Sequence, residues 1–219
     1  MKVAALSDMH GILHTYDFES DIVCICGDIS PLNIQNNMSK MLYWIENVFI
    51  PWTNTLNCDK IFLIAGNHDR LFENRNGKEL LMHSNIIYLE DDLVEHDGKL
   101  IYGTPWCKVF NNWSFMLYPE GLQKMYAKIP ENVDLLLTHD VPYECNDVIL
   151  DPVPWANGEH IGNPQLLEVM KEKKPANLCC GHLHSTDHTP IEFYDTIVRQ
   201  CSIVGEDYKV HYEPQIFEI

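Results

Sequence analysis

Five short apolar runs along the chain each stop just before a segment that contains His, Asp or Asn. A continuous apolar run of this length, bounded by a turn signal, predicts a strand that is buried on both faces. In open α/β sheets, ligands bind in the crevice at the carboxyl ends of such strands. The pattern therefore predicts buried strands that share one site at their carboxyl ends. The runs are residues 3–6, 22–26, 61–65, 135–137 and 178–180.

A helix is predicted between the second and third of these strands. Apolar residues recur at helical spacing over residues 38–49, and Pro51 is expected to end the helix. A helix that connects two strands in this way makes them parallel neighbours, so their carboxyl ends lie at one edge of the sheet. Asp8, Asp28 and Asn67 should therefore lie close together.

A second sheet is predicted to begin after the third strand. Residues 92–95 and 99–102 flank Asp97-Gly98, a dipeptide that suits a type I′ hairpin turn. A hairpin at this place predicts a sheet that is partly antiparallel.

Two further helices are predicted in the second half of the chain. Apolar residues recur at helical spacing over residues 122–129, and Pro130 is expected to close that helix. Asn163-Pro164 has the form of a helix cap followed by proline at the first helical position, and residues 166–170 supply a buried face. Strands that alternate with helices indicate an α/β fold.

Length and composition indicate a single globular domain over residues 1–219. Hydrophobic residues make up 46% of the chain and charged residues 21%, as in ordinary soluble domains. With 15 Lys plus Arg against 32 Asp plus Glu, the formal net charge is -17. Such a surface repels phosphate backbones, which are normally bound by clustered Lys and Arg. We therefore expect no long nucleic acid as substrate or partner.

Cysteine usage and the amino terminus suggest an intracellular protein. Cys24, Cys26, Cys179 and Cys180 lie inside the apolar strands, so buried free thiols are expected rather than disulfides. The chain enters a strand within two residues of Met1, with no basic region, long apolar stretch or cleavage-like site. We therefore expect a cytoplasmic protein that does not contact a membrane, and the sequence leaves the oligomeric state open.

The polar residues that follow the five strands form a constellation that indicates metal binding. A single His or Asp in such a place is most often a turn residue or a helix cap. The same arrangement after every one of the strands is better explained by a shared metal site. The residues are Asp8 and His10 after the first strand, Asp28 after the second, Asn67, His68 and Asp69 after the third, His139 after the fourth, and His182 and His184 after the fifth.

These blocks resemble the five-block signature of the calcineurin-like metallophosphoesterases, and they span residues 8–184. In addition, residues 103–115, Thr138-His139 and the final segment 212–219 resemble a metallophosphoesterase-domain subgroup that acts on small phosphodiesters. The family resemblance implies an α/β fold of two mixed β-sheets, packed as a sandwich and flanked by helices. It places the metals at the carboxyl ends of the strands.

The resemblance also implies two divalent metal ions and their ligands. A carboxylate suits the bridging position because it has two oxygens and carries a negative charge between two cations. Mixed nitrogen and oxygen ligands are compatible with Mn, Fe, Zn, Ni or Co, and Mn is the metal expected to serve in assays. The resemblance assigns Asp8, His10 and His184 to the first metal, Asn67, His139 and His182 to the second, and Asp28 to the bridge.

The chemistry that the resemblance implies is phosphoester hydrolysis by a metal-bound hydroxide. His68 is then the general acid that protonates the leaving group, and Asp69 fixes its orientation and favours its charged form. The alternative for His68 is a residue that only hydrogen-bonds a metal ligand.

One departure from the wider superfamily bears on the substrate. Phosphoprotein phosphatases place an Asp-Arg pair shortly after the second block, whereas this chain continues as residues 29–32, Ile-Ser-Pro-Leu. Nothing in the sequence places Arg70 or Arg199 at the site as a substitute for the arginine of that pair. The side chain that would bind a phosphomonoester dianion is therefore missing. A small phosphodiester, such as a cyclic nucleotide, is therefore the expected substrate. The alternatives are a phosphomonoesterase and a non-catalytic scaffold with the same fold.

The segment 141–163 is predicted to be a long loop beside the metals. It contains too many Pro and Gly residues for regular structure, and it follows His139 directly. Trp155 within it either stacks on a nucleobase or packs the loop onto the domain.

Overall fold

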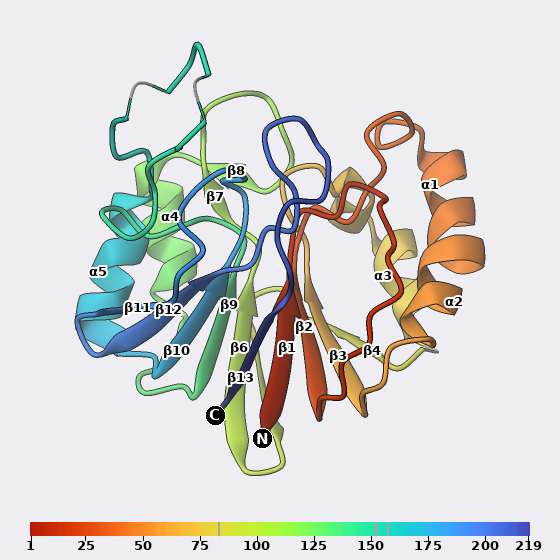
Figure 1. Cartoon of the computed structure of the whole chain (residues 1–219), viewed down its shortest axis with the longest axis horizontal. Helices are drawn as coiled ribbons and strands as arrows, with labels where there is room; N and C mark the ends of the chain where they lie inside the picture. Colours follow the sequence, from red (N-terminus) through yellow and green to blue (C-terminus); the bar gives the residue numbers. More distant parts are fainter. Residues whose placement is uncertain (83, 152, 157) are drawn as a thin grey trace.

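Two large mixed sheets lie face to face, with helices on the outer face of each (Figure 1). The computed structural model describes residues 1–82, 84–151, 153–156 and 158–219. The arrangement confirms the fold class expected from the sequence. Both termini lie at the lower end of the sheets, and the longest loops lie at the upper end (Figure 1).

The first sheet has the strand order β13-β1-β2-β3-β4. The strands β1, β2, β3 and β4 are parallel, and β13 pairs with β1 antiparallel. The parallel pairing confirms the predicted crossover between the second and third apolar runs. The bounds are β1 (Lys2–Leu6), β2 (Ile22–Cys26), β3 (Lys60–Ile64), β4 (Ile86–Tyr88) and β13 (Gln215–Glu218).

The second sheet has the strand order β11-β12-β10-β9-β6-β5. Its four inner strands are parallel and its two edge strands are antiparallel to their neighbours. Asp97 and Gly98 have φ values of 48° and 75°, as a type I′ turn requires, so the predicted hairpin is confirmed. The bounds are β5 (Asp92–His96), β6 (Lys99–Thr104), β9 (Leu135–Thr138), β10 (Asn177–Cys180), β11 (Ile191–Phe193) and β12 (Thr196–Gln200).

A layer of buried apolar side chains fills the space between the sheets. Phe62 and Ile64 of β3, for example, share one buried cluster with Leu137 of β9 and Cys179 of β10. All eight cysteines are free thiols, and seven of them are buried, which confirms the expectation from the sequence. Because the strands are buried on both faces, their apolar runs are continuous rather than alternating.

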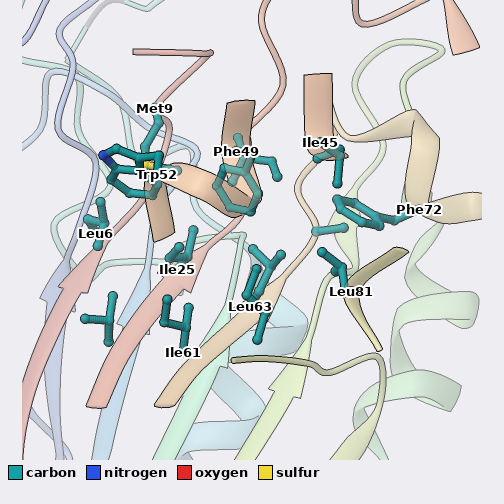
Figure 2. Close-up of a cluster of buried hydrophobic side chains, with 14 of the residues drawn as sticks. Leu6, Met9, Ile25, Ile45, Phe49, Trp52, Ile61, Leu63, Phe72 and Leu81 are labelled. Atoms are coloured by element: carbon teal, nitrogen blue, oxygen red, sulfur yellow. The ribbon is translucent and has the colours of Figure 1, made fainter. Parts of the chain in front are cut away.

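The outer face of the first sheet is covered by a long helical segment. Phe49 and Trp52 of this segment lie over Ile25 and Leu63 of the sheet (Figure 2). The segment consists of α1 (Met38–Trp44), the π-helical turn η1 (Ile45–Phe49) and α2 (Ile50–Thr53). The shorter elements η2 (Arg70–Glu73) and α3 (Arg75–Leu81) follow β3.

The prediction that Pro51 ends the first helix is wrong, because the helix continues to Thr53. In a regular α-helix, the ring of a proline clashes with the carbonyl group four residues before it. Here the preceding turn is widened, and the amide of Ile50 donates to the carbonyl of Ile45, five residues back. The π-helical turn therefore accommodates the proline without breaking the helix.

The outer face of the second sheet is covered by α4 (Pro119–Tyr126) and α5 (Pro164–Lys173). Asn163 caps α5, as predicted: its side-chain oxygen accepts hydrogen bonds from the amides of Gln165 and Leu166. Helix α4 ends at Tyr126, a few residues before Pro130. The small pair β7 (Cys107–Lys108) and β8 (Met116–Leu117) lies beside α4, above the strands of the second sheet (Figure 1). None of the described helices is long and apolar enough to cross a membrane.

Candidate metal centre

The carboxyl ends of five strands meet at the upper end of the sandwich (Figure 1). They come from both sheets, so the site lies where the two sheets converge. The predicted residues follow these ends directly: Asp8 and His10 after β1, Asp28 after β2, Asn67 and His68 after β3, His139 after β9, and His182 and His184 after β10.

Four of these residues have a backbone conformation that is uncommon outside glycine. Asp8, His10, Asp28 and His182 have φ values of 56°, 45°, 53° and 69°. Backbone hydrogen bonds hold the first two in place, from the amide of Asp8 to the carbonyl of Gly27 and from the amide of His10 to the carbonyl of Asp28. Such strain persists only where the surrounding structure enforces it, and it gathers at functional sites.

Glycines in the motifs let the strand ends approach one another. A Cβ atom on Gly66 would lie 2.2 Å from Oδ1 of Asp28 and 2.6 Å from Cε1 of His139. A Cβ atom on Gly181 would lie 2.4 Å from Oδ2 of Asp8. These distances are far below van der Waals contact, so any other residue would push the site apart. The glycines are therefore part of what brings the side chains together.

A first group of possible ligands consists of Asp8, His10 and His184. Their ligand atoms all lie within 4.8 Å of one another, and all three residues are buried. The Nε2 atoms of His10 and His184 are 3.3 Å apart, and Nε2 of His184 lies 3.5 Å from Oδ1 of Asp8. The amide of His182 donates to both carboxylate oxygens of Asp8, which fixes that side chain.

A second group surrounds Nε2 of His139. Oδ1 of Asn67 lies 3.1 Å from this atom and Oδ2 of Asp28 lies 3.4 Å from it. The ring of His182 lies beside that of His139, with 5.1 Å between ring centroids. Oδ2 of Asp28 is also 3.9 Å from Nε2 of His10, in the first group. Asp28 therefore lies between the two groups, where a bridging carboxylate is needed.

Burial and mutual charge set the ionisation of these groups. Burial would raise the pKa of Asp8, but the hydrogen bond with His184 and the charge of His139 lower it to about 2. Burial opposes ionisation of Asp28 as well, yet the charge of His139 holds its pKa well below the usual value. Burial lowers the pKa of His10 and of His182 to about 4. The carboxylates are thus charged and the imidazoles of His10 and His182 neutral, the forms that bind metals. Against the effect of burial, the charge of Asp28 raises the pKa of His139 to about 10, so a metal ion would replace the proton of that imidazole.

This donor set fits divalent transition-metal ions. Imidazole nitrogens and carboxylate oxygens are ligands that Mn, Fe, Zn, Ni and Co share. Two buried carboxylates, Asp8 and Asp28, lie close to one set of imidazoles, and a buried negative charge needs a cation or a hydrogen-bond donor as its partner. Ligand atoms of Asp8, Asp28 and His139 also lie within 4.8 Å of one another, so the two groups form one centre rather than two separate sites.

His68 lies at the rim of this centre and touches a residue that the sequence did not suggest. Its Nε2 atom is 3.9 Å from Oδ2 of Asp28, and its Nδ1 atom is 2.6 Å from Oε1 of Gln35. Its ring lies against that of Trp113, with 4.4 Å between centroids. Gln35 belongs to no motif, so only the folded structure identifies it as the partner of His68.

Asp69 does not have the predicted role of orienting His68. Its carboxylate accepts hydrogen bonds from the amides of Ile29, Ser30 and Gly66 and from the hydroxyl of Ser30. Asp69 is fully buried beneath the site, where it ties the loop after β2 to the loop after β3. The hydrogen bonds that the structure gives for this carboxylate therefore go to Ile29, Ser30 and Gly66, although His68 is its neighbour in sequence.

A cleft of about 790 Å³ opens over the candidate metal centre. Asp28, Asn67, His68, His182 and His184 line its floor or walls, and the remaining lining includes the aromatic residues Phe110, Trp113, Trp155 and Tyr208. Trp155 is 59% exposed, so it does not pack the loop 141–163 onto the domain. Residues 152 and 157 of that loop lie outside the described part of the chain.

The basic residues near the site differ in what they can do. Arg199 is buried, donates to Oδ1 of Asn177 and lies over the ring of Phe217, which is a structural role. Arg70 is exposed and lines a separate pocket next to His68. Lys108 lines the cleft, but its ammonium group donates to the carbonyls of Ile161 and Gly162.

A family model matches most of the chain. The family model described as calcineurin-like phosphoesterase matches residues 1–186. UPF0046 protein T07D4.2 of Caenorhabditis elegans is 36% identical over 146 residues, which cover 66% of this chain and 35% of that protein. Metallophosphoesterase domain-containing protein 1 of Homo sapiens is 28% identical over 190 residues, covering 75% of this chain and 54% of that protein. The chain thus spans about a third to a half of the length of these relatives.

Solved structures with the same fold have little sequence identity to this chain. The TT1561 protein of Thermus thermophilus has a TM-score of 0.59 and 11% identity, with 99% of this chain and 97% of that chain covered. The phosphopantetheinyl hydrolase PptH of Mycobacterium tuberculosis has a TM-score of 0.57 and 11% identity, with 94% and 90% covered. This likeness concerns the fold alone.

Proposed function

Because the chain belongs to the calcineurin-like phosphoesterase family, we propose that it is a metal-dependent phosphodiesterase acting on small diesters such as cyclic nucleotides. The observation that carries the proposal is the position of Asp28. Its carboxylate lies between two groups of buried ligands and also faces Nε2 of His68. One side chain thus connects the metal-binding groups with the group that would give a proton to the substrate.

The residues proposed to hold the metals are those of the two groups described above. When bound, two divalent ions would supply a nucleophile from water at neutral pH and neutralise charge on the phosphoryl oxygens. Asp8, His10 and His184 are proposed for the first ion, Asn67, His139 and His182 for the second, and Asp28 for the bridge.

The proposed task of His68 is to protonate the leaving oxygen. In the imidazolium form both ring nitrogens carry a proton, and the Nδ1 proton is donated to Oε1 of Gln35. This bond fixes the plane of the ring and leaves the Nε2 proton facing the space above Asp28. Trp113 limits rotation from the other side of the ring. The histidine is therefore held in one orientation before substrate binds, as general acid catalysis requires.

A diester fits the charge of the cleft better than a monoester. A phosphomonoester is a dianion, and an arginine side chain usually binds it through two parallel hydrogen bonds. Among the described residues that line the cleft, Lys108 is the one Lys or Arg, and its ammonium group is already bound by two backbone carbonyls. A diester carries one negative charge, so fewer positive side chains are needed to neutralise it.

The aromatic lining of the cleft supports a substrate with a planar group. Trp155, Phe110 and Tyr208 line the same cleft as His182 and His184. Stacking of a base on an aromatic side chain contributes roughly 1–3 kcal/mol and tolerates different bases. A nucleoside arm would place its base among these rings while its phosphate lies over Asp28.

The test compares kcat/KM for bis-p-nitrophenyl phosphate and p-nitrophenyl phosphate after loading with manganese. We expect the diester to be preferred roughly tenfold or more, which corresponds to about 1.4 kcal/mol. The Asp28→Ala variant, purified in the same way, controls for contaminating phosphatases. A preference for the monoester would favour a phosphomonoesterase, and no hydrolysis of either compound would favour a non-catalytic scaffold.

A further inference from the structure

A second pocket, of about 480 Å³, opens on the other side of His68. Of the residues assigned to the metal centre, only Asn67 is among the described residues that line it. Its remaining lining is strongly polar and includes the amides Asn36, Asn111 and Asn112 and the charged residues Arg70 and Glu73. This lining differs in kind from the aromatic lining of the cleft.

His68 and Trp113 form the wall between the two pockets. Both residues line the cleft and the polar pocket, as do Asn67 and Asn111. The loop that carries Trp113 is attached to the metal centre, because the amide of Ser114 donates to the carbonyl of Asn67 at 3.2 Å. A phosphorus atom above Asp28 therefore has the aromatic cleft on one side and the polar pocket beyond His68 on the other.

The lining of the polar pocket matches a neutral arm that is rich in hydroxyl groups. Each amide offers both a donor and an acceptor, and a hydroxyl group both donates and accepts, so the two pair well. Glu73 and the net charge of -17 disfavour an arm with its own negative charge. Arg70 and Glu73 can bind neighbouring hydroxyls as donor and acceptor, and Trp113 offers a flat face to the carbon skeleton. These polar side chains are exposed, so an alkyl arm would leave them bonded to water and would gain no hydrogen bond from them.

We propose that the polar pocket binds the leaving arm of the substrate and that this arm is a polyol, such as a glyceryl or sugar group. The proposal rests on the hydrolysis proposed above, because His68 protonates the oxygen that departs. Water adds its oxygen to phosphorus and loses a proton to solvent, while the bond from phosphorus to the polyol oxygen breaks. That oxygen takes the Nε2 proton of His68, which is regained from solvent. The products are a phosphomonoester on the aromatic arm and a free polyol.

The test uses two diesters of adenosine 5′-phosphate that differ only in the second arm, glyceryl or n-propyl. We expect the wild-type chain to cleave the glyceryl ester with a higher kcat/KM. In Asn112→Ala and in Arg70→Gln, the glyceryl-to-propyl ratio should fall by roughly tenfold, the effect of one or two lost hydrogen bonds. The glyceryl-to-propyl ratio of each variant is compared with that of the wild-type chain, so intrinsic differences in reactivity between the two leaving groups cancel. Asn47→Ala, on the exposed face of the first helical segment, is the matched control and should keep the wild-type ratio.

The outcomes separate the two proposals. A ratio that is unchanged in both pocket variants, or a wild-type preference for the propyl ester, overturns the polyol pocket while diester hydrolysis stands. If the wild-type chain cleaves neither ester, nor bis-p-nitrophenyl phosphate, the proposed hydrolysis is wrong. Calorimetric binding of the two esters then still tests the pocket, and equal dissociation constants for both would overturn it.

Discussion

The imidazole of His68 is held by an uncharged amide, whereas the sequence pointed to the carboxylate of Asp69. The 2.6 Å contact between Nδ1 and Oε1 of Gln35 orients the ring without placing a negative charge on that side of it. Burial lowers the pKa of His68. An amide partner provides orientation through hydrogen bonding alone, so its removal should affect proton transfer rather than metal binding.

The Gln35→Met variant tests this role, because methionine keeps the length of the side chain and removes the acceptor. We expect kcat for a cyclic nucleotide, in which the leaving group is a ribose alkoxide, to fall by about tenfold. This is less than the loss of about 10²–10⁴-fold expected for His68→Ala. The loss with bis-p-nitrophenyl phosphate should be smaller, since p-nitrophenolate departs without a proton.

Two further variants control for this prediction. Gln35→Glu keeps an acceptor at the same reach and should restore most of the rate. Gln123→Met makes the same substitution on the exposed face of α4 and should change nothing. Equal losses of Gln35→Met on both substrates would show that Gln35 has only a structural role.

At the residue scale, the sequence identified the residues that gather at the site but not all of their neighbours. Asp8, Asp28 and His139 were predictable because each follows an apolar strand, and strand position determines where a residue lies. The contacts of Gln35 and Asp69 depend on the path of loops and on the direction of side chains. Neither is encoded in a local pattern.

The loop 141–163 is an element whose place was predictable and whose anchoring was not. Its described residues are tied down by Asp147, which accepts hydrogen bonds from the amides of Glu144 and Gly162 and from Nδ1 of His160. The hydrogen bond with Asp147 raises the pKa of His160. This buried carboxylate holds the base of the loop, while Trp155 remains exposed in the cleft.

The Trp155→Ala variant tests whether this loop binds substrate. Loss of a stacking contact worth about 1–3 kcal/mol should raise KM for a cyclic nucleotide roughly tenfold or more. Bis-p-nitrophenyl phosphate should be affected much less. Trp155→Phe keeps a ring and should retain most of the affinity. Leu150→Ala, at an exposed position of the same loop outside the cleft, is the matched control. An equal rise in KM for both substrates would contradict a role in base stacking.

The start of one helix followed the sequence because two local signals agreed there. Asn163 and Pro164 begin α5 as predicted, because a cap and a proline at the first helical position both favour the same start. The prediction for Pro51 failed, because a single π-helical turn removed the clash that normally ends a helix. The wall between the two pockets was not predictable either, since it depends on where the loop with Trp113 meets His68.

At the scale of the whole molecule, the sandwich brings ligands from two sheets into one centre. Asp8, Asp28 and Asn67 come from the first sheet, and the histidines after β9 and β10 come from the second. Neither sheet alone supplies a complete set of ligands, so the metal centre depends on the packing of the two sheets. Bound metals should in turn stabilise that packing, because ligands that bind only the folded chain shift the folding equilibrium.

A titration of metal into the chelator-treated chain tests the central claim most directly. Manganese is added in known equivalents, and the rate of bis-p-nitrophenyl phosphate hydrolysis is measured at each point with protein well above the dissociation constant. A centre with two ions and one bridging carboxylate predicts no hydrolysis without metal and a plateau at two equivalents per chain. A plateau at one equivalent, or hydrolysis that survives removal of the metal, would contradict the account.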